Sequence, residues 1–130
     1  MYPDAIQLPG LVIYRFDGPL IFAYANLFKA EIRHLARADP PPRWIIVAAE
    51  PITSVDTTAA DMLEELDGEL DAKGINLVFA EMKDAVRQEI RHYGMDWLAD
   101  RDAFYPTIGT AVKAYRQFAG IPKPDRHPGP

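Results

Sequence analysis

The chain has 130 residues, of which 48% are hydrophobic, 25% are charged and none is cysteine. This is the length of about one domain, and the lack of cysteine excludes a disulfide framework, cysteine-ligated metal centres and thiol catalysis. The net charge of −5 argues against a nucleic-acid binder that works by neutralising phosphates. No apolar run is long enough to span a bilayer and no signal peptide opens the chain, so we expect one soluble, acidic, intracellular-type domain.

Apolar segments with two different periods alternate along the chain. Short runs rich in β-branched and aromatic residues predict strands at residues 11–16, 20–23, 44–49 and 75–80. Apolar positions spaced by three and four predict helices at residues 25–38, 56–71, 84–94 and 108–118. The pattern places one domain over residues 8–119, between a linker at 1–7 and a proline-rich, disordered tail at 120–130.

The order of these segments predicts the fold class. Strands separated by helices are joined by right-handed crossovers, which build a mainly parallel sheet. The first two strands are separated only by the tight turn of Asp17, Gly18 and Pro19, which predicts an antiparallel edge. We therefore expect an α/β sandwich with a mixed, mainly parallel sheet and four to five helices.

Side chains at the predicted helix ends support this division. Thr58 with Asp61 has the spacing of a capping box, and Asp84 and Thr107 are cap candidates for the later helices. Gly74 follows the second helix as a predicted C-terminal cap. On the inner faces of the last two helices, the spacing places Tyr93 and Phe118, among others.

The loop between the strand at 44–49 and the next helix is the first candidate for chemistry. Ligands of open α/β sheets gather at the carboxyl ends of strands, and helix N-termini offer unpaired N–H groups to anions. A loop rich in hydroxyls here could bind an anion or accept a phosphoryl group, through Ser54, Asp56, Thr57 and Thr58. The same residue types are ordinary N-terminal caps, and the pattern alone favours that role.

Other catalytic and metal-binding arrangements find no support. A phospho-accepting aspartate of the receiver type at Asp56 would need an acidic pair after the first strand, where only Asp17 stands, and a lysine after the third. The histidines are scattered without metal spacing, at His34, His92 and His127. There is no phosphate-binding loop, dinucleotide motif or nucleophile elbow. We expect neither an enzyme nor a metal site.

Charge is distributed unevenly between two of the predicted helices. The helix at 56–71 carries seven carboxylates and no basic residue, whereas the helix at 25–38 has three basic residues against Glu31. Opposed charge could steer a partner or another copy of the chain. A solvated face explains the same pattern and is the more common case.

Three segments together resemble a known family. Residues 10–26, GLVIYRFDGPLIFAYAN, resemble the opening of the STAS domain of SulP-type sulfate and anion transporters. Residues 54–60, SVDTTAA, resemble the aspartate–hydroxyl loop that this domain shares with anti-sigma factor antagonists, and residues 104–112, FYPTIGTAV, are similar to its closing segment. The resemblance covers residues 8–118 in the family's order.

The resemblance implies a STAS-type αβ sandwich at the cytoplasmic side of the plasma (inner) membrane, after a transmembrane anion-transport domain. It implies a regulatory or interaction role rather than catalysis. In the antagonists the first hydroxyl after the aspartate is phosphorylated, and that position is Thr57 here. Threonine at this position, with Ala59 in place of the antagonists' glycine, points to the transporter branch.

Three functional hypotheses follow from the resemblance. The first is a non-enzymatic module that docks on the transmembrane domain or on a second copy of the transporter, through the turn of Asp17, Gly18 and Pro19 and the loop of Asp56 to Thr58. The second is a free-standing antagonist switched by phosphorylation at Thr57 or Thr58. The third is a nucleotide sensor for GTP, GDP or ATP, as has been proposed for the family, with only the helix N-terminus at Asp56 as a site. No other cofactor and no nucleic acid are expected, and the isolated domain is expected to be monomeric.

Overall fold

The computed structural model describes residues 8–122, without the side chains of residues 99 and 100. The predicted linker at 1–7 and most of the predicted tail, including His127, lie outside the described residues. The elements follow in the order β1 (Leu11–Arg15), α1 (Phe22–Ala36), β2 (Trp44–Ala48), α2 (Thr57–Ala72), β3 (Asn76–Ala80), α3 (Asp84–His92), α4 (Asp96–Asp100), β4 (Phe104–Tyr105) and α5 (Ile108–Ala119).

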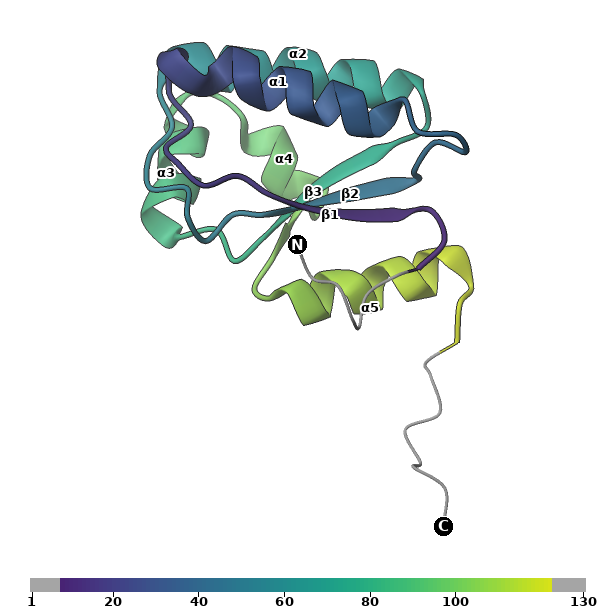
Figure 1. The fold of residues 1–130 in the computed structure, drawn as a ribbon. Helices are drawn as coiled ribbons and strands as arrows, with labels where there is room; N and C mark the ends of the chain where they lie inside the picture. Colours follow the sequence, from purple (N-terminus) through teal and green to yellow (C-terminus); the bar gives the residue numbers. More distant parts are fainter. Residues whose placement is uncertain (1–7, 123–130) are drawn as a thin grey trace.

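The four strands form one parallel sheet in the order β1-β2-β3-β4. Leu11 lies opposite Trp44 in the first ladder, and Trp44 lies opposite Asn76 in the second. Helices α1 and α2 lie side by side over one face of the sheet, and α5 covers the opposite face (Figure 1). This three-layer arrangement confirms the predicted α/β class and, with five helices, the predicted helix content.

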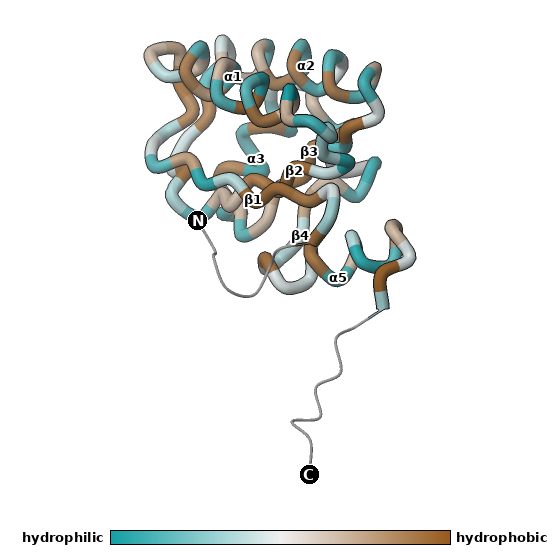
Figure 2. The backbone as a smooth tube through the Cα atoms, turned by 45° about the vertical axis from the view of Figure 1, so that its right-hand side comes forward, coloured by the Kyte–Doolittle hydropathy of each residue, from teal (hydrophilic) through white to brown (hydrophobic). Residues whose placement is uncertain are grey.

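Two cores lie on the two faces of the sheet. The larger one joins the sheet to α1–α4, and the smaller one joins it to α5 around Trp44, Ile46 and Tyr115. Figure 2 shows mainly hydrophobic residues along the strands, whereas hydrophobic and hydrophilic residues alternate along α1 and α2. Strand β2 is buried at every position, as its continuous apolar sequence predicts.

The predicted second strand, at residues 20–23, is wrong. Leu20 makes a single isolated parallel bridge with Val55, and α1 begins at Phe22. The first buried positions after Leu20 are Ala25 and Phe28, whereas the side chain of Phe22 is 68% exposed. That spacing suits a helix and not a strand, so within residues 8–122 the antiparallel edge predicted for the sheet is absent and every ladder is parallel.

The helix ends correct two of the predicted caps. Asp56, and not Thr58 with Asp61, caps α2, because its extended backbone lets the carboxylate reach the N–H of Ala59. Asp84 is the first residue of α3, and Lys83 takes the N-cap position without a side-chain cap bond. Thr107 is confirmed as the N-cap of α5, where it forms a capping box with Thr110.

The remaining differences concern short elements and exposed aromatic rings. Helix α4 and the two-residue strand β4 lie in a segment whose sequence shows no regular period. Tyr93 and Phe118, predicted to face inward, are 36% and 53% exposed. Tyr93 follows the last residue of α3, and Phe118, in the last turn of α5, is partly covered by Trp44 and Arg43. Gly74 does follow α2 with a left-handed φ of 75°.

Candidate functional site

Asp56 lies where the N-termini of two helices meet. One carboxylate oxygen accepts a hydrogen bond from the N–H of Ala59 in the first turn of α2, at 2.9 Å. The other accepts one from the N–H of Phe22, the first residue of α1, at 2.8 Å. The N-cap residue of α1, Ile21, has no side-chain acceptor of its own. A single carboxylate therefore completes the first turns of both helices.

Backbone hydrogen bonds hold the same two segments together. The N–H of Leu20 donates to the carbonyl of Ser54 at 2.9 Å, and the N–H of Asp56 donates to the carbonyl of Leu20 at 3.2 Å. These bonds make the isolated bridge between Leu20 and Val55. The segment after β1 and the segment after β2, two separate candidates in the sequence, thus lie side by side.

The hydroxyl residues of the loop occupy different positions around Asp56. Thr57 and Thr58 are the first two residues of α2 and are exposed, whereas Ser54 is half-buried. The N–H groups of Phe22 and Ala59, which could bind an external anion, already donate to Asp56. The internal carboxylate thus takes the position that the sequence offered to a bound anion.

The loop is also tied to helix α3 on its other side. The carboxylate of Glu89 accepts a hydrogen bond from the N–H of Val55 at 3.1 Å. The ammonium of Lys83 donates to the carbonyl of Glu50 and forms an ion pair with its carboxylate. The loop of residues 50–56 is therefore held at Glu50, Val55 and Asp56. These contacts keep Thr57 and Thr58, which follow the loop, in a defined place.

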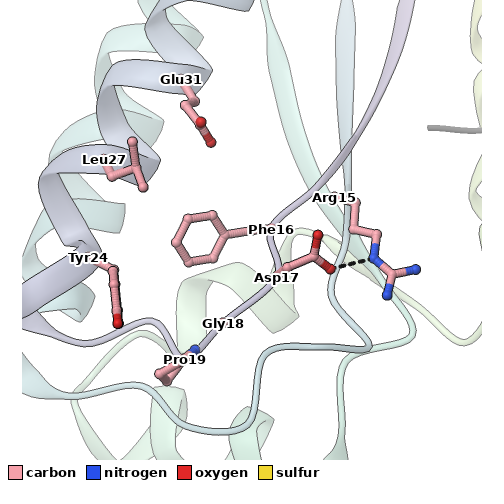
Figure 3. A pocket seen from close by; sticks show the side chains of 8 residues that line it. All are labelled: Arg15, Phe16, Asp17, Gly18, Pro19, Tyr24, Leu27 and Glu31. Atoms are coloured by element: carbon pink, nitrogen blue, oxygen red, sulfur yellow. Dashed lines mark hydrogen bonds and ion pairs between the residues drawn. The ribbon is translucent and has the colours of Figure 1, made fainter.

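The turn after β1 borders a hollow of about 350 Å³ between this turn and α1 (Figure 3). Asp17, which faces solvent, accepts a hydrogen bond from Nε of Arg15 at 2.6 Å. The side chains of α1 on this side are Tyr24 and Leu27, which are 44% and 50% exposed. The hollow is lined by Arg15, Phe16, Asp17, Gly18, Pro19, Tyr24, Leu27 and Glu31.

Exposed apolar side chains gather at the start of α1. Phe22 is 68% exposed, and with Tyr24 and Leu27 it makes up three of the five large hydrophobic residues that are exposed among the described residues. Tyr24 and Leu27 lie on the side of α1 that borders the hollow, whereas Phe22, two residues before Tyr24, lies on a different side of the helix. For the docking hypothesis, we refer to Asp17, Gly18, Pro19, Phe22, Tyr24, Leu27 and residues 56–58 as the docking face.

Tyr14 and Glu31 connect β1 to α1 beside this face. The hydroxyl of Tyr14 donates a hydrogen bond to the carboxylate of Glu31. Burial, and next the hydrogen bond to Glu31, raises the pKa of Tyr14 well above that of a free tyrosine. The Tyr14 phenol is therefore a neutral donor that fixes the Glu31 carboxylate.

The described part of the chain offers neither a cluster of metal ligands nor a membrane-spanning helix. Within residues 8–122, no group of three or more His, Asp or Glu side chains could hold a metal ion. His34 and His92 are exposed on different helices. None of the helices in that range is long and apolar enough to cross a membrane.

The model of the STAS domain family matches residues 2–111, which includes every element from β1 to the start of α5. The chain belongs to the STAS domain family. The resemblance of its three segments is thereby confirmed. Its STAS domain is 37% identical, over 117 residues, to a probable sulfate transporter of Mycobacterium tuberculosis, and the match covers 89% of this chain. Because the match covers 21% of that transporter, the chain spans about one-fifth of the relative's length.

Solved structures show the same fold at low sequence identity. The STAS domain of a SulP transporter from Vibrio cholerae matches 92% of this chain and 91% of its own, with a TM-score of 0.73 at 22% identity. A putative anti-sigma factor antagonist from Thermotoga maritima matches 84% of this chain and 90% of its own, with a TM-score of 0.69 at 17% identity. Transporter domains and antagonists therefore share this STAS fold.

Sequence reasoning missed several residues of the docking face of this STAS domain. The sequence pattern places Phe22 in a strand and gives no signal for Tyr24 or Leu27. The predicted helix begins at residue 25, and its apolar spacing gives no signal for the earlier start of α1 at Phe22. Glu89 had no such signal, because its bond to Val55 depends on how α3 packs against the loop.

Proposed function

We propose that this STAS domain is the cytoplasmic regulatory module of a SulP-type sulfate or anion transporter and acts by protein docking, without catalysis. The observation that carries this proposal is the 37% identity to a probable sulfate transporter over 89% of the chain. About four-fifths of that relative lies outside the match. The corresponding transmembrane part is the partner that we propose for this domain.

The docking face supplies a surface of suitable composition. It combines exposed apolar side chains with the turn of residues 17–19 and the start of α2. Asp56 and the Leu20–Val55 bridge hold its two halves in one arrangement. A domain that docks with different contacts on two transporter conformations shifts the balance between them, which is regulation without chemistry.

A fractionation blot on native cells, with an antibody raised to this domain, tests the proposal. We expect a band several times larger than 14.6 kDa in the membrane fraction. A soluble band near 14.6 kDa would overturn the transporter assignment and favour a free-standing protein.

A charge change on the docking face tests the docking step in that transporter. Thr57→Glu adds a carboxylate beside Asp56 at the exposed start of α2, so we expect altered sulfate uptake by a folded domain. Gln117→Glu is the matched control, because it adds the same charge at an exposed position of α5, on the opposite face of the sheet. Equal uptake by both variants and the unmodified transporter would remove this loop from the mechanism.

A free-standing antagonist switched by phosphorylation is the second candidate. It is favoured by the fold shared with the Thermotoga maritima protein and by the exposure of Thr57 and Thr58. A phosphate on either would add a charge of about −1.5 to −2 next to the Asp56 carboxylate and repel an acidic partner. Mass spectrometry of the protein from its native cells should then find phosphate on one of these threonines; only unmodified peptide would count against this role.

We do not extend the proposal to GTP, GDP or ATP. The N-terminus of α2 was the only phosphate-binding feature that the sequence offered. In the structure, the carboxylate of Asp56 already accepts the hydrogen bond from the N–H of Ala59 at this helix N-terminus. Its negative charge also disfavours the binding of a phosphate beside it.

A further inference from the structure

In the part of the chain that the structure describes, no strand pairs with the outer edge of β1. Among the described residues β1 pairs only with β2, at its inner edge. The N–H of Trp44 donates to the carbonyl of Gly10. In a parallel ladder, every second residue of a strand directs its backbone N–H and C=O groups to the same neighbouring strand. Counting from Gly10, the backbone groups of Val12 and Tyr14 therefore point to β2, and those of Ile13 point outward. An added strand could pair with Ile13.

The composition of β1 suits such pairing. Four of its five residues are apolar, and these four are half-buried, whereas β2 is fully buried. Proteins usually protect edge strands with lysine, proline or very short length. Strand β1 has no lysine and no proline, while the opposite edge, β4, has only two residues. The two edges of the sheet are therefore not equivalent.

Helix α1 forms a groove beside this edge. The hollow shown in Figure 3 runs from Phe16 and Tyr24 past Leu27 to Glu31. A second hollow, of about 340 Å³, continues from Glu31 and is lined by Tyr14, Ala30, Glu31, His34 and Leu35. Glu31 borders both hollows, and we refer to the two together as the groove between β1 and α1. The second hollow is largely apolar, whereas the first combines the apolar Leu27, which is 50% exposed, with charged side chains.

The charge of the groove indicates what it would bind. Asp17 is paired with Arg15 at one end. Glu31 accepts a hydrogen bond from the neutral Tyr14 and has no ion pair with any residue in the described range. The uncompensated charge at the middle of the groove is therefore negative, and a lysine or arginine of a ligand would complement it.

We propose that the groove between β1 and α1 binds an extended peptide segment, which adds to β1 as a fifth strand. Its backbone pairs with Ile13, its alternate apolar side chains contact Tyr14 and Leu27, and a lysine or arginine pairs with Glu31. Main-chain bonds supply affinity and alternate side chains supply specificity in this mode of recognition. The inference rests on the interaction role proposed above and names the chemistry of its partner segment.

The proposed strand addition can be tested by titrating the 130-residue chain with two synthetic nine-residue peptides in which valine and threonine alternate. One has lysine at its centre and the other has glutamate. We expect the lysine peptide to bind saturably, to shift the amide resonance of Ile13, and to protect that amide from hydrogen exchange. Affinity for the glutamate peptide should be lower by about ten-fold, because a charge-assisted bond is replaced by repulsion.

Three variants assign the binding to this groove. Leu27→Lys should abolish binding, since it places a charge on the apolar wall. Glu31→Gln keeps an acceptor for Tyr14 and should remove the preference for the lysine peptide. Tyr93→Lys is the control, because Tyr93 is an exposed aromatic residue at the end of α3 and does not line the groove. This variant should bind the peptides as the unmodified chain does. Thermal unfolding of each variant checks that it is folded.

Several results would overturn the inference. An unshifted Ile13 amide at millimolar peptide would exclude strand addition, and equal affinity for both peptides would exclude the role of Glu31. Light scattering that shows a dimer, with the Ile13 amide protected before peptide is added, would assign the edge to a second copy of the chain. These measurements do not involve transport, so they fail or succeed separately from the fractionation blot.

Discussion

The carboxylate of Asp56 accepts a hydrogen bond from the backbone N–H of Phe22, 34 residues earlier in the chain, at 2.8 Å. Its other oxygen accepts from the N–H of Ala59 at 2.9 Å. One acidic side chain thus caps its own helix and the helix before it. The exposed apolar start of α1 and the hydroxyl residues of the α2 loop are held together by this residue, which makes them a single surface.

Loss of the Asp56 carboxylate should destabilise both helix starts. We expect Asp56→Ala to lower the free energy of unfolding by about 2–3 kcal/mol, since each lost cap bond costs about 1 kcal/mol or more. Asp56→Asn retains one oxygen acceptor, so its free energy of unfolding should lie between those of Asp56→Ala and the unmodified chain. Urea unfolding measures both. A cost for Asp56→Ala below about 0.5 kcal/mol, the usual range of surface substitutions, would contradict the double cap.

Thr107 and Thr58 should differ in their contribution to stability. Thr107→Ala removes the capping box with Thr110 and should cost about 1 kcal/mol. Thr58→Ala is the matched control: Thr58 is exposed and Asp56 already caps its helix, so its effect should stay within about 0.5 kcal/mol. Equal losses in urea unfolding would mean that Thr58 is a cap after all.

Gly10 occupies a position that only glycine suits. Its φ is +81°, and a Cβ would lie 2.5 Å from the hydroxyl oxygen of Tyr115, which donates to the carbonyl of Pro9. We expect Gly10→Ala to cost about 1–3 kcal/mol through backbone strain and the lost hydrogen bond. Gly18→Ala is the control, because no atom lies within 4 Å of its Cβ position. Thermal unfolding that ranks the two variants equally would contradict this.

The raised pKa of Tyr14 makes stability depend on pH in the alkaline range. The unfolded chain ionises this phenol near pH 10, while the folded chain keeps it neutral to higher pH. Its stabilising contribution is therefore complete below pH 10 and is lost as the pH rises above it. Between pH 8 and pH 11, the free energy of unfolding, measured with urea, should fall less for Tyr14→Phe than for the unmodified chain. The exposed Tyr93→Phe should retain the full sensitivity.

Phe22 should matter for docking and not for folding. Its side chain is 68% exposed, so Phe22→Ser should change the free energy of unfolding by about 0.5 kcal/mol at most. In the transporter proposed above, the same substitution should alter sulfate uptake, whereas Tyr93→Ser on α3 should not. If both variants transport like the unmodified protein, the start of α1 is not part of the contact.

Much of the fold follows from local patterns. The apolar runs of β2 and β3 and the apolar spacing of α2 and α5 are strong signals, because residues buried on both faces or along one stripe must be apolar. Thr107 was identified as a cap for the same local reason, since its partner Thr110 is only three residues away. The three family-like segments depend on sequence alone and identified the STAS domain.

The tertiary structure decided how the candidate segments meet. Residues 20–23 have the local pattern of a strand, but Leu20 forms only an isolated bridge with Val55, and the cap supplied by Asp56 begins a helix at Phe22. The bond from Val55 to Glu89 and the groove along β1 also join residues far apart in the chain. Local periodicity carries no information on such pairings, because their free energy arises only when the sheet and its helices are assembled.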